Sequence, residues 1–201
     1  MKIEKREIGR RLIHIALGLI IVFLILNNLL TTTLLFLILV FGFILSVISI
    51  KYKIPGIHWF LKNFERDEYI HVFPGKGLIF FLIGVLLVMK LFNEEIALAS
   101  IMVLTFGDGL SHLIGKGLGR VKFPLNGHKS LEGVIGGIIA GGIAAAFFVP
   151  IFTAFFGSLI GMSIEAIGLK MGNADVDDNV IVPLVAGTAI YLFQTNFSIF
   201  I

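Results

Sequence analysis

The sequence predicts an all-α, polytopic integral membrane protein, and three observations lead to this fold class. Hydrophobic residues make up 57% of the 201-residue chain and the mean hydropathy is +1.01, values typical of membrane proteins rather than soluble domains. Apolar runs of membrane-spanning length recur along the chain, and the charged residues gather between them. At this length we expect one membrane-embedded domain, residues 1–201.

Seven apolar segments are predicted to cross the membrane. About 20 helical residues span a hydrocarbon core of ~30 Å, and the segments are close to that length. The charged leader resembles the start of a signal peptide but has no small-residue cleavage site, so we interpret it as part of a retained first span. The predicted spans are residues 12–29, 32–50, 77–92, 95–114, 133–149, 151–169 and 180–196.

The distribution of Lys and Arg predicts the orientation of these spans. With the N-terminus in the cytoplasm, 15 of the 16 basic residues fall in cytoplasmic segments, and Lys90 is the exception. The positive-inside rule describes this asymmetry, and it explains the pI near 9.2 without nucleic-acid binding. We therefore predict a cell-membrane protein with its C-terminus outside and its polar loops, including any active site, facing the cytoplasm.

Glycine spacing and cysteine content bear on packing and chemistry. Gly133, Gly137 and Gly141 recur every four residues in the fifth predicted span, a spacing that lets helices approach closely. The chain has no cysteine, which excludes disulfides and thiolate chemistry. The amphipathic linker 51–76 is expected to lie on the membrane surface, with Arg66 and Lys76 its best candidates for a site.

The segment 105–133 is predicted to carry the chemistry. Besides His112, it places seven charged or titratable side chains and seven glycines in 29 residues between apolar spans. Because a charge costs about 2.5–3.5 kcal/mol at mid-bilayer, this clustering indicates a functional site. Carboxylates for a cation, and amines and backbone N–H groups for phosphate oxygens, suit a metal-bound polyphosphate. The charged or titratable side chains that define it are Asp108, Lys116, Arg120, Lys122, His128, Lys129 and Glu132.

Asp108, between Gly107 and Gly109, is predicted to bind metal or act as a general base, with helix capping as the alternative. The 12 residues 96–107 would rise only about 18 Å as a helix, too little to cross the core. Either the helix continues to residue 114 or it breaks at the Gly-Asp-Gly sequence. Both arrangements place Asp108 near headgroup depth, where irregular backbone must be buried in protein or line a wet cavity. His112, one turn later, is expected to have a polar packing role.

Further carboxylates are predicted to share a divalent metal with Asp108. Glu132 enters the fifth span, where a bound cation or a salt bridge would relieve the cost of its charge. Glu165 lies near the cytoplasmic end of the sixth span. The predicted metal ligands are Asp108, Glu132, Glu165, Asp177, Asp178 and Asn179, and the predicted catalytic residues are Asp108, Glu132 and Asp178.

Two short motifs are predicted to bind the polyphosphate. Residues 115–120 combine glycine with basic residues, although they form no Walker A sequence, and a loop that binds lipid headgroups explains them as well. In the second motif, Lys129 and Ser130 can reach phosphate oxygens. The full predicted set is Gly107, Gly109, Gly115, Lys116, Gly119, Arg120, His128, Lys129 and Ser130.

These motifs together resemble the dolichol kinase, phytol kinase and CTP-dependent diacylglycerol kinase family, which is distantly similar to phosphatidate cytidylyltransferases. The resemblance implies a membrane enzyme that uses Mg²⁺ and transfers the γ-phosphoryl group of CTP to the hydroxyl of a membrane lipid alcohol. His112 departs from the small residue expected after Gly-Asp-Gly, which bears on the choice of acceptor. The motifs that carry the resemblance are Gly107-Asp108-Gly109, Ile114-Gly115-Lys116, Lys129-Ser130-Leu131-Glu132-Gly133, Glu165, Asp177-Asp178-Asn179 with Pro183-Leu184, Arg10-Arg11 with His14, and Gly75 with Gly77.

Two other functions stay open at this point. A cytidylyltransferase acting on phosphatidate would also use CTP and metal, but would make a CDP-activated lipid. An ion-coupled transporter could bind its ion at a helix broken near Asp108. The gathering of charge on one face favours an enzyme, since phosphoryl transfer needs mainly positioning and charge neutralisation. The acceptor, an isoprenoid alcohol such as a polyprenol or a diradylglycerol, and the oligomeric state are left open.

Overall fold

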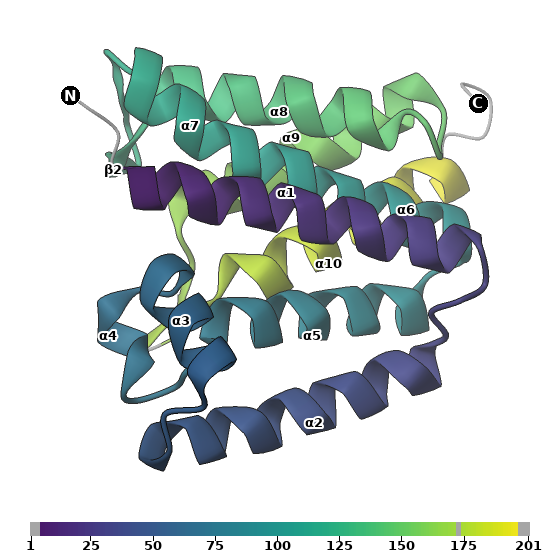
Figure 1. Cartoon of the computed structure of the whole chain (residues 1–201). Helices are drawn as coiled ribbons and strands as arrows, with labels where there is room; N and C mark the ends of the chain where they lie inside the picture. Colours follow the sequence, from purple (N-terminus) through teal and green to yellow (C-terminus); the bar gives the residue numbers. More distant parts are fainter. Residues whose placement is uncertain (1–4, 172–173, 197–201) are drawn as a thin grey trace.

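Helices form most of the chain in the computed structural model, which describes residues 5–171 and 174–196, and the all-α prediction is confirmed. The long helices lie side by side along one direction, and β2, α3 and α4 lie at the same end of the bundle (Figure 1). The elements are α1 (Lys5–Leu26), α2 (Thr32–Lys51), α3 (Pro55–Phe64), α4 (Asp67–Ile70), α5 (Lys76–Leu91), α6 (Glu94–Met102), the π-helical turn η1 (Val103–Asp108), α7 (Gly109–Leu118), β1 (Lys122–Phe123), β2 (Asn126–Ser130), α8 (Leu131–Ala145), α9 (Ile151–Ile167), β3 (Lys170–Met171), β4 (Ala174–Asp175) and α10 (Asp178–Asn196).

Local sequence explains where several helices begin. The side chains of Thr31, Asn93 and Ser130 accept hydrogen bonds from backbone N–H groups in the first turns of α2, α6 and α8. Such caps satisfy donors that have no partner within the helix. The two antiparallel hairpins are short: β1 pairs with β2 between α7 and α8, and β3 pairs with β4 between α9 and α10.

The helix that carries Asp108 is continuous. α6, η1 and α7 together run from Glu94 to Leu118, so the first of the two arrangements predicted for this segment is the one that the structure has. η1 supplies an irregular turn without a break. Its residues Val103, Leu104 and Thr105 are fully buried, so this turn lies in the core of the bundle.

The prediction of seven membrane spans is not supported by helix length and composition. Three helical stretches of the described residues are long and apolar enough to cross a membrane: 6–26, 32–51 and 94–118. α8 and α9 are shorter apolar helices of 15 and 17 residues. The predicted fifth span, 133–149, included residues of the connection between two helices. In the structure α8 ends at Ala145 and α9 begins at Ile151. α8 therefore rises only about 22 Å, less than the ~30 Å core.

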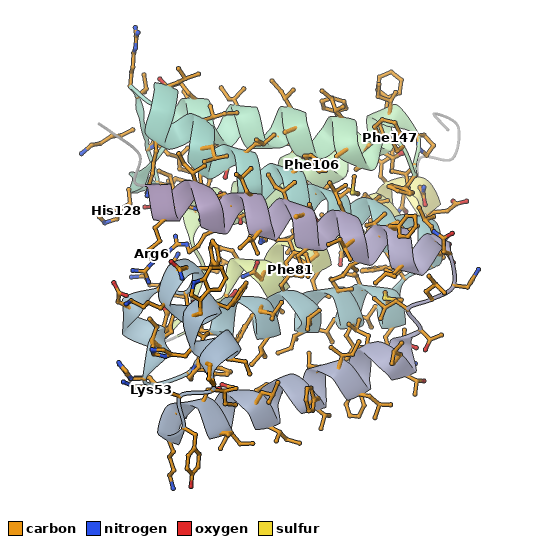
Figure 2. All side chains as sticks on the ribbon, in the orientation of Figure 1. Arg6, Lys53, Phe81, Phe106, His128 and Phe147 are labelled. Atoms are coloured by element: carbon orange, nitrogen blue, oxygen red, sulfur yellow. The ribbon has the colours of Figure 1, made fainter. Side chains whose placement is uncertain are left out.

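Packing differs sharply between the outer and inner helices. In its most apolar window, α2 buries 17% of its residues, whereas the 94–118 stretch buries 78%. Side chains of α2 such as Leu37 and Phe41 are therefore exposed, which is the pattern expected of a helix that faces lipid. Figure 2 shows Phe81 and Phe106 within the bundle and Phe147 near one end.

The glycine-rich α8 packs closely against α7 and α9, which confirms the packing role predicted for its glycines. A Cβ on Gly133 would lie 2.6 Å from the Ser111 carbonyl oxygen. A Cβ on Gly137 would lie 2.8 Å from both Met162 Cε and Ser111 Cβ. Such distances are too short for carbon atoms, so these helices could not approach as closely with larger residues.

Candidate active site

The polar end of the bundle contains two adjoining cavities. Figure 2 shows Arg6, Lys53 and His128 at this end, opposite Phe147. The large cavity has a volume of about 830 Å³ and lies among α1, α3, α5, η1, α9 and the start of α10. The small cavity has a volume of about 610 Å³ and lies among α1, α7, the β1–β2 hairpin and α8. Both are lined by Arg10, Arg11, Arg66, His112, Gly127, His128, Lys129 and Glu165.

Asp108 lies at the end of η1 and is almost completely buried, with 4% of its surface exposed. Its Oδ2 accepts a hydrogen bond of 2.6 Å from Arg11 Nη1 on α1. His14 Nε2 lies 3.7 Å from the same oxygen, and His112 Nε2 lies 3.4 Å from Oδ1. A buried carboxylate needs such partners, because an uncompensated charge is costly away from water.

Glu165, on α9, lies beside this group and is 1% exposed. Its Oε1 forms an ion pair with Lys129 and lies 3.6 Å from His112 Nε2. Its Oε2 is buried and has no hydrogen-bond partner among the residues that the structure describes. One ligand atom each from Asp108, His112 and Glu165 lie within 4.8 Å of one another. His112 therefore links two carboxylates, a role beyond the packing role predicted for it.

The acidic residues before α10 line the large cavity. Asp177, Asp178 and Asn179 all contribute to its wall. Asp177 accepts hydrogen bonds from the backbone and side-chain nitrogens of Asn179, and its Oδ2 lies 3.8 Å from Lys76 Nζ. Asp178 forms no ion pair with any residue in the described part of the chain. Of the two carboxylates in this group, Asp178 is thus the one without an ion-paired cation among the described residues.

The glycine and basic residues of α7 and the β1–β2 hairpin line the small cavity. The structure brings together Gly115, Lys116, Gly119, Arg120, Lys129 and Ser130 there, as predicted for one site. Lys116 Nζ lies 3.2 Å from Glu7 Oε2, and Arg10 hydrogen-bonds to the same oxygen at 2.9 Å. The Ser130 hydroxyl caps α8 by accepting from Gly133 N at 3.1 Å. Ser130 therefore has a structural role in addition to its place at the cavity.

Three predicted site residues are placed elsewhere. Gly107 and Gly109 are buried in helix contacts, where added Cβ atoms would meet Met162 Sδ at 2.6 Å and Ile15 Cγ1 at 2.8 Å, and they line neither cavity. Glu132 is half-buried, and its Oε1 accepts hydrogen bonds from the backbone N–H groups of residues 120 and 121 at 2.9 and 3.0 Å. Glu132 thus orders the turn before β1, and the structure does not bring it to Asp108.

The contribution of α1 was not predicted as part of the site. Glu7, Arg10, Arg11 and His14 lie at intervals of three and four residues, so they share one face of α1. This face reaches Asp108 because Gly18 leaves room for Thr105, which would overlap any side chain there. The basic pair was interpreted as an orientation signal and, with His14, as part of the family resemblance, but neither arginine was among the predicted site residues. The sequence feature that could have indicated a site on α1 was His14, because it is an ionisable residue within the first predicted span.

Two curated proteins are similar to this chain. CTP-dependent diacylglycerol kinase 1 of Schizosaccharomyces pombe is 28% identical over 132 residues, which are 59% of this chain and 61% of that kinase. The match thus spans about three fifths of the kinase. An uncharacterized protein of Methanocaldococcus jannaschii, MJ1137, is 30% identical over 185 residues, 90% of each chain. Neither a family model nor a solved structure matches this chain.

Proposed function

Because this chain belongs to the same family as MJ1137 of Methanocaldococcus jannaschii and is distantly related to a CTP-dependent diacylglycerol kinase, we propose that it is a CTP-dependent lipid kinase. The proposed reaction joins the oxygen of a lipid hydroxyl to the γ-phosphorus of CTP and breaks the bond from that phosphorus to the β–γ bridging oxygen. The products are a lipid phosphate, CDP and the hydroxyl proton. The acceptor is an isoprenoid alcohol or a diradylglycerol.

One observation carries this proposal: a row of ionisable groups, buried or half-buried, lies at the border of the two cavities. Arg11, Asp108, His112, Glu165 and Lys129 are connected by contacts of 2.6 to 3.6 Å and the Lys129–Glu165 ion pair. Fixed cations and carboxylates between two substrate-sized spaces suit phosphoryl transfer, which depends on positioning and on neutralising phosphate charge. Arg11 and Lys129 are the cations nearest to a phosphoryl group placed at this border.

Asp178 is the residue proposed to accept the hydroxyl proton. It lines the large cavity and is not engaged by a close cation among the described residues. Asp108, in contrast, is held by Arg11 at 2.6 Å. A carboxylate already neutralised by a guanidinium is a weaker base than one without a paired cation, so Asp178 fits this role better.

Mg²⁺ is the cofactor that this reaction calls for, and the residues present fit it. Mg²⁺ binds through one or two carboxylates together with substrate phosphates and water. Glu165 Oε2 is buried without a hydrogen-bond partner among the described residues, and Asp108 offers a second carboxylate nearby. We propose that Glu165 and Asp108 hold the ion. Bound there, Mg²⁺ would offset the negative charge of the phosphates during transfer.

The proposed orientation places both cavities at the cytoplasmic face of the cell membrane. The polar end carries the basic loops, among them Lys53 and His128 (Figure 2), and CTP is a cytoplasmic solute. A site at this face would let a soluble nucleotide and a membrane lipid reach the same residues.

Two singly labelled forms of CTP test the function directly. Purified protein in detergent is incubated with Mg²⁺, a panel of isoprenoid alcohols, diradylglycerols and phosphatidate, and CTP carrying label at either the α- or the γ-phosphorus. We expect γ-label, and no α-label, in a lipid product. Incorporation of α-label with release of pyrophosphate would identify a cytidylyltransferase instead. Competition by unlabelled ATP, GTP and UTP then measures the preference for CTP.

A further inference from the structure

The large cavity has one apolar wall and one charged wall. The apolar wall comes from α1, α3 and α5, through Ile13, Leu17, Phe60, Phe64, Leu78 and Phe81. Asp108, Glu165 and Asp178 belong to the charged wall. The small cavity has no comparable apolar wall in the described part of the chain, since its lining is mainly basic residues, glycine and hydroxyl groups. The two cavities therefore suit different kinds of molecule.

The charges of the two cavities differ in the same sense. Seven Lys and Arg residues and two carboxylates line the small cavity, among the described residues. Six Lys and Arg residues and five carboxylates line the large one. A triphosphate needs an excess of cations, because its charge must be neutralised in a partly desolvated site. Among the described residues, cations outnumber carboxylates by five in the small cavity and by one in the large cavity, so the small cavity suits a triphosphate better.

At least five of the six Lys and Arg residues that line the large cavity are engaged by carboxylates, and four of these five also line the small cavity. Arg11 pairs with Asp108, Lys129 with Glu165, and Lys76 lies 3.8 Å from Asp177. Arg10 pairs with Glu7 at 2.9 Å, and Arg66 lies 3.7 Å from Glu68. An anionic lipid headgroup would have to compete with these carboxylates. An uncharged hydroxyl would not, and it can donate a hydrogen bond to one of them.

α3 places the apolar wall at the membrane surface. Trp59 is 62% exposed on this short helix, while Phe60 lines the cavity, so the helix has one aromatic face outward and one inward. The helix is held against α1 by Phe64, whose ring would lie 3.2 Å from a Cβ on Gly9. Arg6 adds hydrogen bonds to Asp67 and to the Glu65 carbonyl oxygen. Exposed Trp and amphipathic helices are typical of the membrane interface.

We infer that the large cavity receives an uncharged lipid alcohol, with its hydrocarbon along α3 and α5 and its hydroxyl at the carboxylates, while the small cavity receives the nucleotide triphosphate. This inference rests on the proposed function and adds which cavity each substrate occupies. The transferred phosphoryl group passes at the shared border, from the small cavity to the hydroxyl in the large one.

Nucleotide binding without any acceptor tests the small cavity. Arg120→Gln changes a residue that lines only the small cavity, and Lys62→Gln is its control on α3, in neither lining. We expect Arg120→Gln to raise the Kd of Mg²⁺–CTP about tenfold by calorimetry in detergent, as loss of one charge-assisted contact would. Lys62→Gln should leave the Kd unchanged. An unchanged Kd in Arg120→Gln would overturn the assignment of the nucleotide.

Photolabelling tests the large cavity without requiring turnover. The probes are a diacylglycerol and a polyprenol, each with a diazirine near the hydroxyl, in phosphatidylcholine nanodiscs. Leu78→Trp fills the large cavity, and Leu37→Trp on the exposed face of α2 is the matched control. We expect at least one probe to label α3 and the start of α5. The labelling yield of these segments should be at least fivefold lower in Leu78→Trp and undiminished in Leu37→Trp. Labelling of these segments no stronger than by a diazirine phosphatidylcholine would overturn the inference.

Competition distinguishes an uncharged from an anionic lipid. Unlabelled lipid of the probe's own class should displace it, whereas phosphatidate at the same concentration should not. Stronger displacement by phosphatidate would overturn the inference. Neither the nucleotide-binding measurement nor the photolabelling measurement uses the reaction. A kinase assay without γ-label transfer would therefore reject the proposed function, whereas each cavity assignment would still be decided by its own binding or labelling result.

Discussion

Replacing Asp108 by Asn separates its structural role from its chemical one. The Arg11 and Asp108 side chains are 10% and 6% exposed, so the variant leaves a buried guanidinium facing a neutral amide. Breaking a buried pair in this way costs about 3–5 kcal/mol, which corresponds to a fall in Tm of roughly 10 °C for a chain of this size. Turnover should also fall at least ~100-fold, because a carboxylate at the phosphoryl group is lost.

The double variant Arg11→Met/Asp108→Asn distinguishes the two effects. Removing both charges leaves no uncompensated group, so Tm should return to within a few degrees of the original. Turnover of γ-labelled CTP should stay low. Lys122→Ala is the control, since Lys122 is exposed at the small cavity, and a loss of only a few fold is expected. Recovery of both Tm and turnover in the double variant would show that Asp108 is structural, and near-normal turnover in Asp108→Asn would refute its proposed role.

Three further outcomes are expected. Gly137→Val should destabilise the protein by about 1–3 kcal/mol, because the new Cβ would lie 2.9 Å from the Gly107 carbonyl oxygen. The control Gly56→Ala, with open space around it, should leave Tm unchanged. Equal Tm values for the two variants would contradict the close packing of α8. Removing Mg²⁺ with EDTA should abolish γ-label transfer and added Mg²⁺ should restore it, so undiminished transfer in EDTA would reject the cofactor. Single cysteines at residues 53 and 122 should react with a membrane-impermeant reagent only from the cytoplasmic side, and labelling from outside would reverse the orientation.

The sequence predicted the helical class and the glycine packing of α8, and several of the predicted phosphate-binding residues line the small cavity. These features follow from local patterns: hydropathy, spacing and charge. Span number was harder, because hydropathy does not show where a helix ends, and α8 stops at Ala145 before the Pro150 turn. The sequence also left two arrangements open at Asp108, since glycine is compatible with both a break and a close helix contact.

The site residues on α1 depended on tertiary structure. Arg11 and Asp108 are 97 positions apart, and only the packing of α1 on η1 brings them together. Charge alone did not distinguish Glu132 from Glu165. Glu132 was expected to need a cation. Instead, its carboxylate accepts hydrogen bonds from the backbone N–H groups of residues 120 and 121, which lie 12 and 11 positions earlier in the chain. Hydrogen-bond partners of this kind become visible only when the loop conformation is known.

The π-helical turn fixes the rotational phase between two halves of one long helix. Each residue of an α-helix advances the side-chain direction by about 100° around the helix axis. A π turn holds roughly one extra residue, so it changes the direction in which the following side chains point. α6 can therefore keep its packing face toward the core while Asp108 lines the large cavity and His112 lines both cavities. Deleting one residue within Val103–Phe106 would remove this offset and swing the carboxylate away from Arg11, although every apolar residue of α6 would stay in place.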